Sequence, residues 1–95
     1  MIRNVVVGKL REGVAPEDVE KALDAIVALD PPGCLSMLVG TDAGLREGNW
    51  DFTITADFAD VDSYRAYDLD EEHGRIRREL FAPISEDIVR IQIDV

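Results

Sequence analysis

Residues 50–58 read Trp-Asp-Phe-Thr-Ile-Thr-Ala-Asp-Phe, and this stretch determines the fold that we expect for the chain. Apolar and polar residues alternate along it, which is the pattern of a β-strand with one buried face and one polar face. The apolar parity that begins at Trp50 is expected to face a core. The other parity carries only aspartates and threonines, so the two faces of the sheet are expected to meet different surroundings.

Three further segments have the character of strands. Residues 2–10 contain three consecutive valines, which suits a strand that is covered on both faces. Residues 34–41 and 84–95 alternate in side-chain parity along a strand. The intervening residues 42–49 contain two glycines and few apolar side chains, so we interpret them as an exposed hairpin loop.

A helix is expected from Pro16 to Leu29. Proline suits the first helical position because its missing N–H would be unpaired there in any case. Apolar residues then recur at helical spacing. The Pro-Pro-Gly sequence at 31–33 ends the helix.

The segment 63–83 predicts a pair of short helices. Ser63 is expected to cap the first, which runs through Tyr67, and Asp70 is expected to cap the second. The element order is then strand, helix, strand, strand, helix pair, strand. This order predicts an α+β, ferredoxin-like β-α-β-β-α-β fold: one domain, residues 1–95, with an antiparallel sheet and helices on one face.

Helices on one side leave the other face of such a sheet uncovered. That face would expose a contiguous patch, which on a soluble protein indicates an interface. A two-fold homodimer, sheet against sheet, is the simplest closed arrangement. The residues expected at this interface are Val5, Val7, Leu38, Thr53 and Thr55.

Composition limits the partners and the compartment. Twenty acidic residues against ten basic ones give a formal charge of −10, a field that repels nucleic acid and anionic lipid. Cys34 is the only cysteine, so no internal disulfide forms, which fits a reducing compartment. No segment has the length and apolarity of a membrane span or a signal peptide. We therefore expect a cytoplasmic protein without nucleic-acid or membrane partners.

The segment 63–83 also contains His73, the only histidine, and both tyrosines, Tyr64 and Tyr67. Histidine is the side chain that titrates near neutrality without perturbation. The acidic residues around it, from Asp68 to Glu72, are expected to favour the imidazolium form. A histidine that merely packs at a helix N-terminus is the alternative interpretation.

Three places in the chain are similar to one known family. Residues 1–14 are similar to an opening I-R-H-V-V-x-F-K followed by an acidic turn and Gly-Val. Residues 50–60 are similar to an aromatic-led strand with an F-x-D exit, and residues 67–73 are similar to the motif Y-x-x-H-P-x-H. Together these motifs resemble the stress-responsive α/β-barrel domain, or Dabb, family over essentially the whole chain. Asn4 replaces the early histidine of that family, and Asp70 and Glu71 replace the first histidine and the proline of its motif.

The resemblance implies a dimeric α+β barrel in which most members have no assigned activity. Some plant members are cofactor-free polyketide cyclases that use a tyrosine and the last histidine of the motif. Carried over by position, these are Tyr67 and His73. His73 would remove a proton next to a carbonyl, and Tyr67 would donate a hydrogen bond to the oxygen that becomes negative. No residues have metal-ligand spacing, and no cofactor is expected.

A modest, largely apolar pocket is expected between the sheet and its helices. Gly8 would either widen it or admit a neighbouring ring, and the aromatic residues would either line it or belong to the core. An arginine cluster at 75–78 would form surface salt bridges or bind an acidic ligand. The residues expected to line the pocket are Asn4, Val6, Gly8, Trp50, Phe52, Tyr64 and Ile76.

Three functions follow from these expectations. The first is a Dabb-like homodimer that binds a small apolar or keto-type molecule. The second is a cofactor-free, polyketide-cyclase-like lyase that uses His73 and Tyr67. The third is a structural or stress-response protein without catalysis. The antibiotic-biosynthesis monooxygenase class shares the dimeric barrel, but the opening strand and the spacing from Tyr67 to His73 favour the Dabb family.

Overall fold

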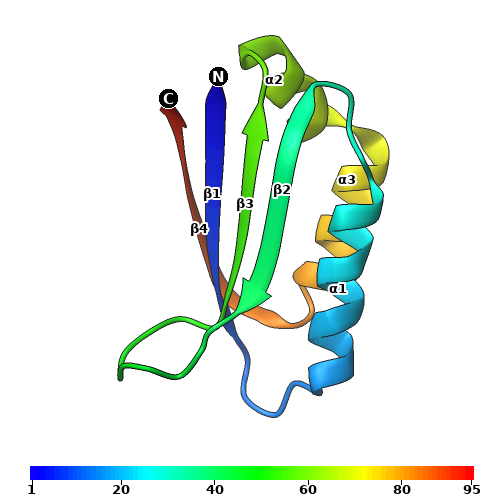
Figure 1. The fold of residues 1–95 in the computed structure, drawn as a ribbon. Coiled ribbons are helices and arrows are strands. Elements are labelled where there is room, and N and C mark those ends of the chain that lie inside the picture. The colour runs from blue at the N-terminus through cyan, green and yellow to red at the C-terminus, as the bar shows by residue number, and fades with distance from the viewer.

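The computed structural model describes residues 1–95 and has a four-stranded antiparallel sheet with all helices on one face (Figure 1). The strands lie in the order β2-β3-β1-β4. The expected ferredoxin-like α+β fold is confirmed. The elements are β1 (Ile2–Leu10), α1 (Pro16–Ala28), β2 (Cys34–Thr41), β3 (Phe52–Phe58), α2 (Val61–Leu69), α3 (Glu71–Ile76), the π-helical turn η1 (Arg77–Phe81) and β4 (Ser85–Asp94).

Two expected boundaries are wrong. Strand β3 begins at Phe52 and not at Trp50. The reason is that Asp51 is hydrogen-bonded to the end of β1 through both its backbone and its side chain. Its N–H donates to the carbonyl of Gly8, and its carboxylate accepts from the N–H of Leu10, both at 2.8 Å. Helix α2 begins at Val61 and not at Ser63. Its cap is Asp60, whose carboxylate accepts from the Ser63 N–H at 2.8 Å.

The core lies between the sheet and helix α1. Along β3, Phe52, Ile54, Ala56 and Phe58 are all buried, as their alternation predicts. Helix α1 contributes its apolar stripe to the same core, including Ile26, which is 1% exposed. Asp70 caps α3 as expected, since its carboxylate accepts from the N–H of His73 at 2.9 Å. This cap fixes the start of the helix that carries the histidine.

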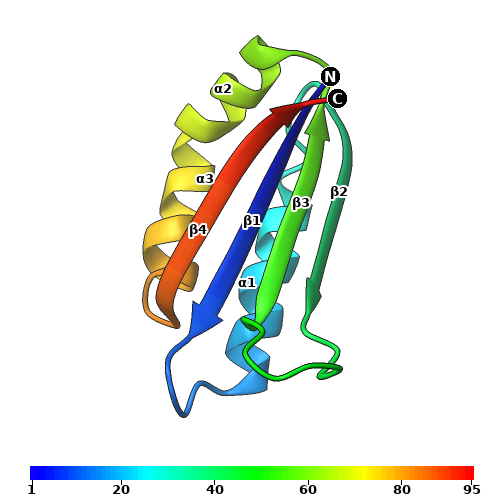
Figure 2. The same ribbon diagram turned by 90° about the vertical axis from the view of Figure 1, so that its left-hand side faces the viewer.

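The opposite face of the sheet carries no helix (Figure 2). Leu38 pairs with Thr55, Val7 with Thr53, and Val5 with Thr55, so the expected interface residues do share one face. Strand β4 enlarges this face: Ile91 pairs with Val5 and is 59% exposed. We call this surface the open face; its residues are Val5, Val7, Leu38, Thr53, Thr55, Val89, Ile91 and Ile93.

Helix α3 runs directly into a wider turn at Arg77–Phe81. The N–H of Ala82 donates to the carbonyl of Arg77 at 2.9 Å, a bond across five residues. In an α-helix, four residues make slightly more than one turn, so residues four apart are offset by about 40° around the helix axis. In a wider turn, four residues make slightly less than one turn, so the offset has the opposite direction. The turn therefore brings His73, Arg77 and Phe81 closer to a single line facing the sheet.

Candidate functional site

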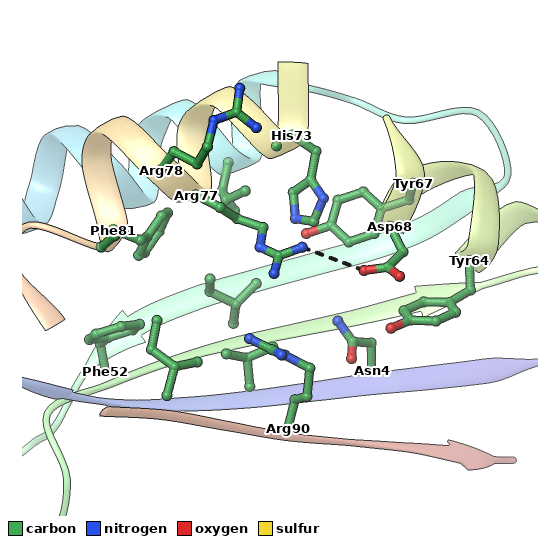
Figure 3. A pocket seen from close by; sticks show the side chains of 16 residues that line it. Asn4, Phe52, Tyr64, Tyr67, Asp68, His73, Arg77, Arg78, Phe81 and Arg90 are labelled. Carbon is green, nitrogen blue, oxygen red and sulfur yellow. Dashed lines mark ion pairs between the residues drawn. The ribbon is translucent and has the colours of Figure 1, made fainter. Parts of the chain in front are cut away.

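A cavity of about 420 Å³ lies between the sheet and the segment from α2 to η1 (Figure 3). Its volume lies within the usual range of small-molecule sites, roughly 300–1,000 Å³. Strands form one wall and the helices form the other. Apolar side chains, among them Val6, Ile54 and Phe52, supply most of the lining. The other lining residues are Asn4, Ile26, Tyr64, Tyr67, Asp68, His73, Gly74, Arg77, Arg78, Phe81, Ala82, Ile88 and Arg90.

Tyr67 and His73 stack at one end of the cavity. Their ring centroids are 4.1 Å apart and their planes are inclined by 30°. Tyr67 lies near the end of α2, and the cap residue Asp70 links this helix to α3, since its N–H donates to the Tyr67 carbonyl at 3.2 Å. The short connection thus sets the two rings against each other. Both side chains are buried, at 5% and 7% exposure.

The protonation of His73 differs from the expectation. Burial lowers the pKa of His73, and the nearby Arg77 guanidinium lowers it further, while the backbone carbonyl of Asp68 and the carboxylates of Asp68 and Asp70 act in the opposite direction. Asp68 and Asp70 do favour the imidazolium, as expected, but burial and the Arg77 cation outweigh them. The lowered pKa favours the neutral ring at pH 7. Its Nδ1 atom is buried without a hydrogen-bond partner.

Tyr67 is held in its protonated form. Burial raises the pKa of Tyr67 to about 12, so its hydroxyl is a hydrogen-bond donor at neutral pH. The hydroxyl points toward the centre of the cavity, on the side where the Arg77 guanidinium lies (Figure 3). A neutral imidazole and a neutral phenol thus stand beside one another. This pair can accept a proton and donate a hydrogen bond at the same time.

Asn4 occupies the opposite wall of the cavity. It is 3% exposed, and its Oδ1 accepts from Nε2 of Gln92 on β4 at 2.8 Å. The bond fixes the amide, and its nitrogen is directed toward the cavity (Figure 3). Asn4 therefore offers a donor from the sheet, across from the two rings of the helical wall.

The structure brings together six of the nine residues singled out as site candidates. Asn4, Val6, Phe52, Tyr64, Tyr67 and His73 all line the cavity. Ile76 does not line it, although it is buried nearby in the core. The ring of Phe52 lies over Gly8, where a Cβ would overlap it, so the glycine admits a ring and does not widen the cavity.

Trp50 lies elsewhere. It precedes the start of β3, so the alternation of that strand does not place it in the core. It borders a separate hollow at the loop end of the sheet, together with Val7, Gly40 and Thr53. The expected role of Trp50 as a lining residue of the main cavity is wrong for this reason.

Three arginines of the cavity wall were not among the site candidates. Arg77 and Arg78 belong to the basic cluster noted in the sequence, and Arg90 comes from β4. Arg90 pairs with Val6, so it shares the helix-facing side of the sheet with that valine. The alternation of β4 already separates Arg90 from Val89 and Ile91, but only the pairing with β1 shows which side meets the cavity.

The whole chain matches one protein family. The model of the stress responsive A/B barrel domain, Dabb, matches residues 2–95. The chain belongs to this family. The resemblance of its three sequence motifs is thereby confirmed. A search of curated proteins finds no match to this Dabb-family chain.

Solved structures agree with this assignment. A dimeric ferredoxin-like protein of unknown function from Thermobifida fusca is 30% identical, with a TM-score of 0.90, over 99% of this chain and 90% of that one. A Dabb family protein from Mesorhizobium loti is 19% identical, with a TM-score of 0.79, over 99% and 95%. A hydroxynitrile lyase from Passiflora edulis is 17% identical, with a TM-score of 0.86, over 99% and 92%. The last two show the shared fold.

The rest of the molecule offers little further chemistry. No group of three or more His, Cys, Asp or Glu side chains is arranged to hold a metal ion. Cys34 is partly exposed, and its Sγ lies 3.4 Å from the carbonyl oxygen of Ser36. None of the helices has the length and apolar character needed to cross a bilayer.

Proposed function

We propose that this Dabb-family protein binds a small, largely apolar carbonyl compound in the cavity between its sheet and helices. The observation that carries the proposal is the stacked pair of Tyr67 and His73 at one end of an otherwise mainly apolar cavity. Apolar walls favour a hydrocarbon body, and a fixed donor beside them selects a carbonyl oxygen. Asn4 adds a second donor from the opposite wall.

Binding can be mapped by NMR on the isotope-labelled protein. We would titrate 4-phenyl-2-butanone, which joins a phenylethyl body to a ketone, and follow the backbone amide signals. The proposal expects shifts at cavity residues such as Ile54 and His73, with the open-face residue Leu38 unchanged. Shifts spread over both faces, or none at millimolar ligand, would contradict it.

Catalysis is a second candidate, which the neutral state of His73 favours. A general base must be unprotonated at the working pH, and burial lowers the pKa of His73 in that direction. His73 would take a proton from the carbon next to the carbonyl while Tyr67 donates to the oxygen, giving an enolate. In a polyketide-cyclase-like lyase this carbon would then attack a second carbonyl of the same substrate. The hydroxynitrile lyase among the structural neighbours supports the idea that this fold can carry lyase chemistry.

Proton abstraction has its own test. In heavy water, His73-dependent abstraction would exchange the protons next to the carbonyl of 4-phenyl-2-butanone for deuterium. We expect exchange above the buffer rate in the wild type, and its loss in His73→Gln and in Tyr67→Phe. If binding persists in the mapping experiment but exchange stays at the buffer rate, binding stands and this catalytic role is rejected. A structural protein without a ligand is less well supported, because its protomer would be expected to be fully packed, without a cavity between the sheet and the helices.

We also propose that two copies pair through the open face. Relatives described as dimeric support a homodimer. Exposed apolar side chains such as Leu38, at 69% exposure, and Ile91 make this face the best candidate. A single domain over residues 1–95 fits the packing of every helix on one sheet. The free thiol of Cys34 fits a cytoplasmic location.

A further inference from the structure

Two arginines face the cavity from opposite walls. Arg77 comes from η1, on the helical wall, and Arg90 comes from β4, on the sheet wall. Figure 3 shows both side chains extending into the space between the walls, whereas the guanidinium of Arg78 turns away from it. Arg90 and Arg77 also both act on Tyr64: burial and the Asp68 carboxylate raise the pKa of that hydroxyl, and the two guanidiniums oppose the rise. The two cations therefore converge on one region.

Neither of these two arginines forms a close ion pair, and neither do Arg11, Arg46, Arg65 and Arg78. Arg75 pairs with both Glu72 and Glu79, with its Nη1 2.7 Å from Oε2 of Glu79. Arg77 has only a long pair, with its Nη1 3.7 Å from Oδ1 of Asp68, and Arg90 has no ion pair. Their donors are available to a molecule that enters the cavity.

The balance of charge suggests what that molecule carries. Asp68 is the one acidic side chain of the cavity lining. Counting only the charged groups that face the cavity, and so leaving out Arg78, the charges of Arg77, Arg90 and Asp68 sum to one positive charge, which matches a single carboxylate. A phosphate monoester would bring roughly 1.5 to 2 negative charges, which is more than the positive charge of the site can balance. Arginine also presents the planar, forked donors that a carboxylate accepts well.

We infer that the ligand of this cavity is a monocarboxylic acid with an apolar body, whose carboxylate lies between Arg77 and Arg90. The hydrocarbon part contacts apolar residues such as Ile54, Phe52 and Phe81. A keto group on the same molecule would be directed toward Tyr67 and His73. This inference rests on the proposed function, because it names the class of ligand for the same cavity.

The test uses three compounds that share one phenylethyl body. They are 3-phenylpropanoate, its neutral amide 3-phenylpropanamide, and the ketone 4-phenyl-2-butanone. Binding to the wild type would be measured by calorimetry, with NMR for weak affinities. We expect the carboxylate to bind about tenfold more tightly than the amide, the effect of one well-placed charged hydrogen bond. We expect this preference to shrink as salt is raised.

Variants test the residues. Arg90→Gln and Arg77→Gln should each weaken 3-phenylpropanoate binding by about tenfold and leave the two neutral compounds within about twofold. Arg46→Gln removes the same charge from the exposed loop before β3, outside the cavity, and is the matched control. All three arginines are exposed, so the variants should keep the fold, which circular dichroism would verify.

Each outcome decides between the two proposals. If the neutral compounds bind as tightly as the carboxylate, the anionic ligand is rejected and the proposed function stands. If Arg46→Gln weakens binding as much as Arg90→Gln, general charge attraction explains the preference and the carboxylate site is rejected. If none of the three compounds binds, the proposed function fails and this inference fails with it.

Discussion

The imidazole of His73 lies against the phenol ring of Tyr67, with ring centroids 4.1 Å apart. Helix α2 ends and helix α3 begins between these two residues, so the contact joins the two helices as well as the two rings. An uncharged imidazole stacks on a phenol without the cost of burying a cation. The stacking, the burial and the neutral state of His73 are therefore parts of one arrangement.

The first prediction concerns the effect of Arg77 on His73. Removing the guanidinium in Arg77→Gln should raise the pKa of His73, because the cation disfavours the imidazolium. Arg78→Gln is the control, since the Arg78 guanidinium points away from the cavity. Proton NMR titration of the single histidine measures both. Equal pKa values in the two variants would show that Arg77 has no special effect on the ring.

The second prediction concerns stability and pH. Folding lowers the pKa of His73, so the unfolded chain binds the proton more readily. Stability is therefore greatest above the unfolded pKa, about 6.5, and is lost as the pH falls through the folded value. Urea unfolding at about pH 7.5 and about pH 5 should show a larger loss for the wild type than for His73→Phe. The carboxylates are the same in both proteins, so their effects cancel in this difference. Parallel losses would exclude a lowered pKa.

The third prediction concerns the contact of Gly8 with Phe52. In Gly8→Ala the new Cβ would overlap the Phe52 ring, which must move within the packed core. We expect a loss of about 1–3 kcal/mol in the free energy of unfolding. Gly40→Ala in β2 is the matched control, because a Cβ there has no neighbour within 4 Å. Urea unfolding of both variants would reveal the difference, and similar stabilities would mean that the ring is not held over Gly8.

The fourth prediction concerns assembly. Ile91→Glu places a charge on the open face, beside Val5, where a partner sheet would leave it unpaired. We expect dimers for the wild type and monomers for the variant by sedimentation at micromolar concentration. Leu45→Glu is the control, since Leu45 is 90% exposed and lies in the loop before β3. If Ile91→Glu remains as dimeric as the control, the interface lies elsewhere.

The sequence predicted the architecture well because its decisive signals are local. The alternation from Phe52 to Phe58 identifies the buried face of the sheet, and the Asp70 cap marks the start of α3. The error at Trp50 has a distant cause, since the strand boundary depends on bonds from Asp51 to β1. No local pattern contains that information.

The site was predicted less completely for the same reason. The role of Arg90 depends on the pairing of β4 with β1, two strands from opposite ends of the chain. The protonation of His73 depends on which charges lie near the ring in space. Four acidic neighbours in the sequence suggested a cation, yet burial and Arg77 determine the outcome. Counting charges along the sequence shows neither how deeply a side chain is buried nor which charged groups lie near it in the folded protein.

The wide turn at Arg77–Phe81 also affects how such a site can diversify among related chains. A turn of this kind accommodates one residue more than an ordinary helical turn. Deleting that residue would therefore restore an ordinary helical turn and leave the residues on either side close to the faces they now occupy. A single-codon deletion would thus remove one position of the helical wall and keep the others facing the cavity, whereas a point substitution exchanges one side chain. Family members that differ in length by one residue here should keep both the sheet and the side chains that face the cavity from either side of the turn.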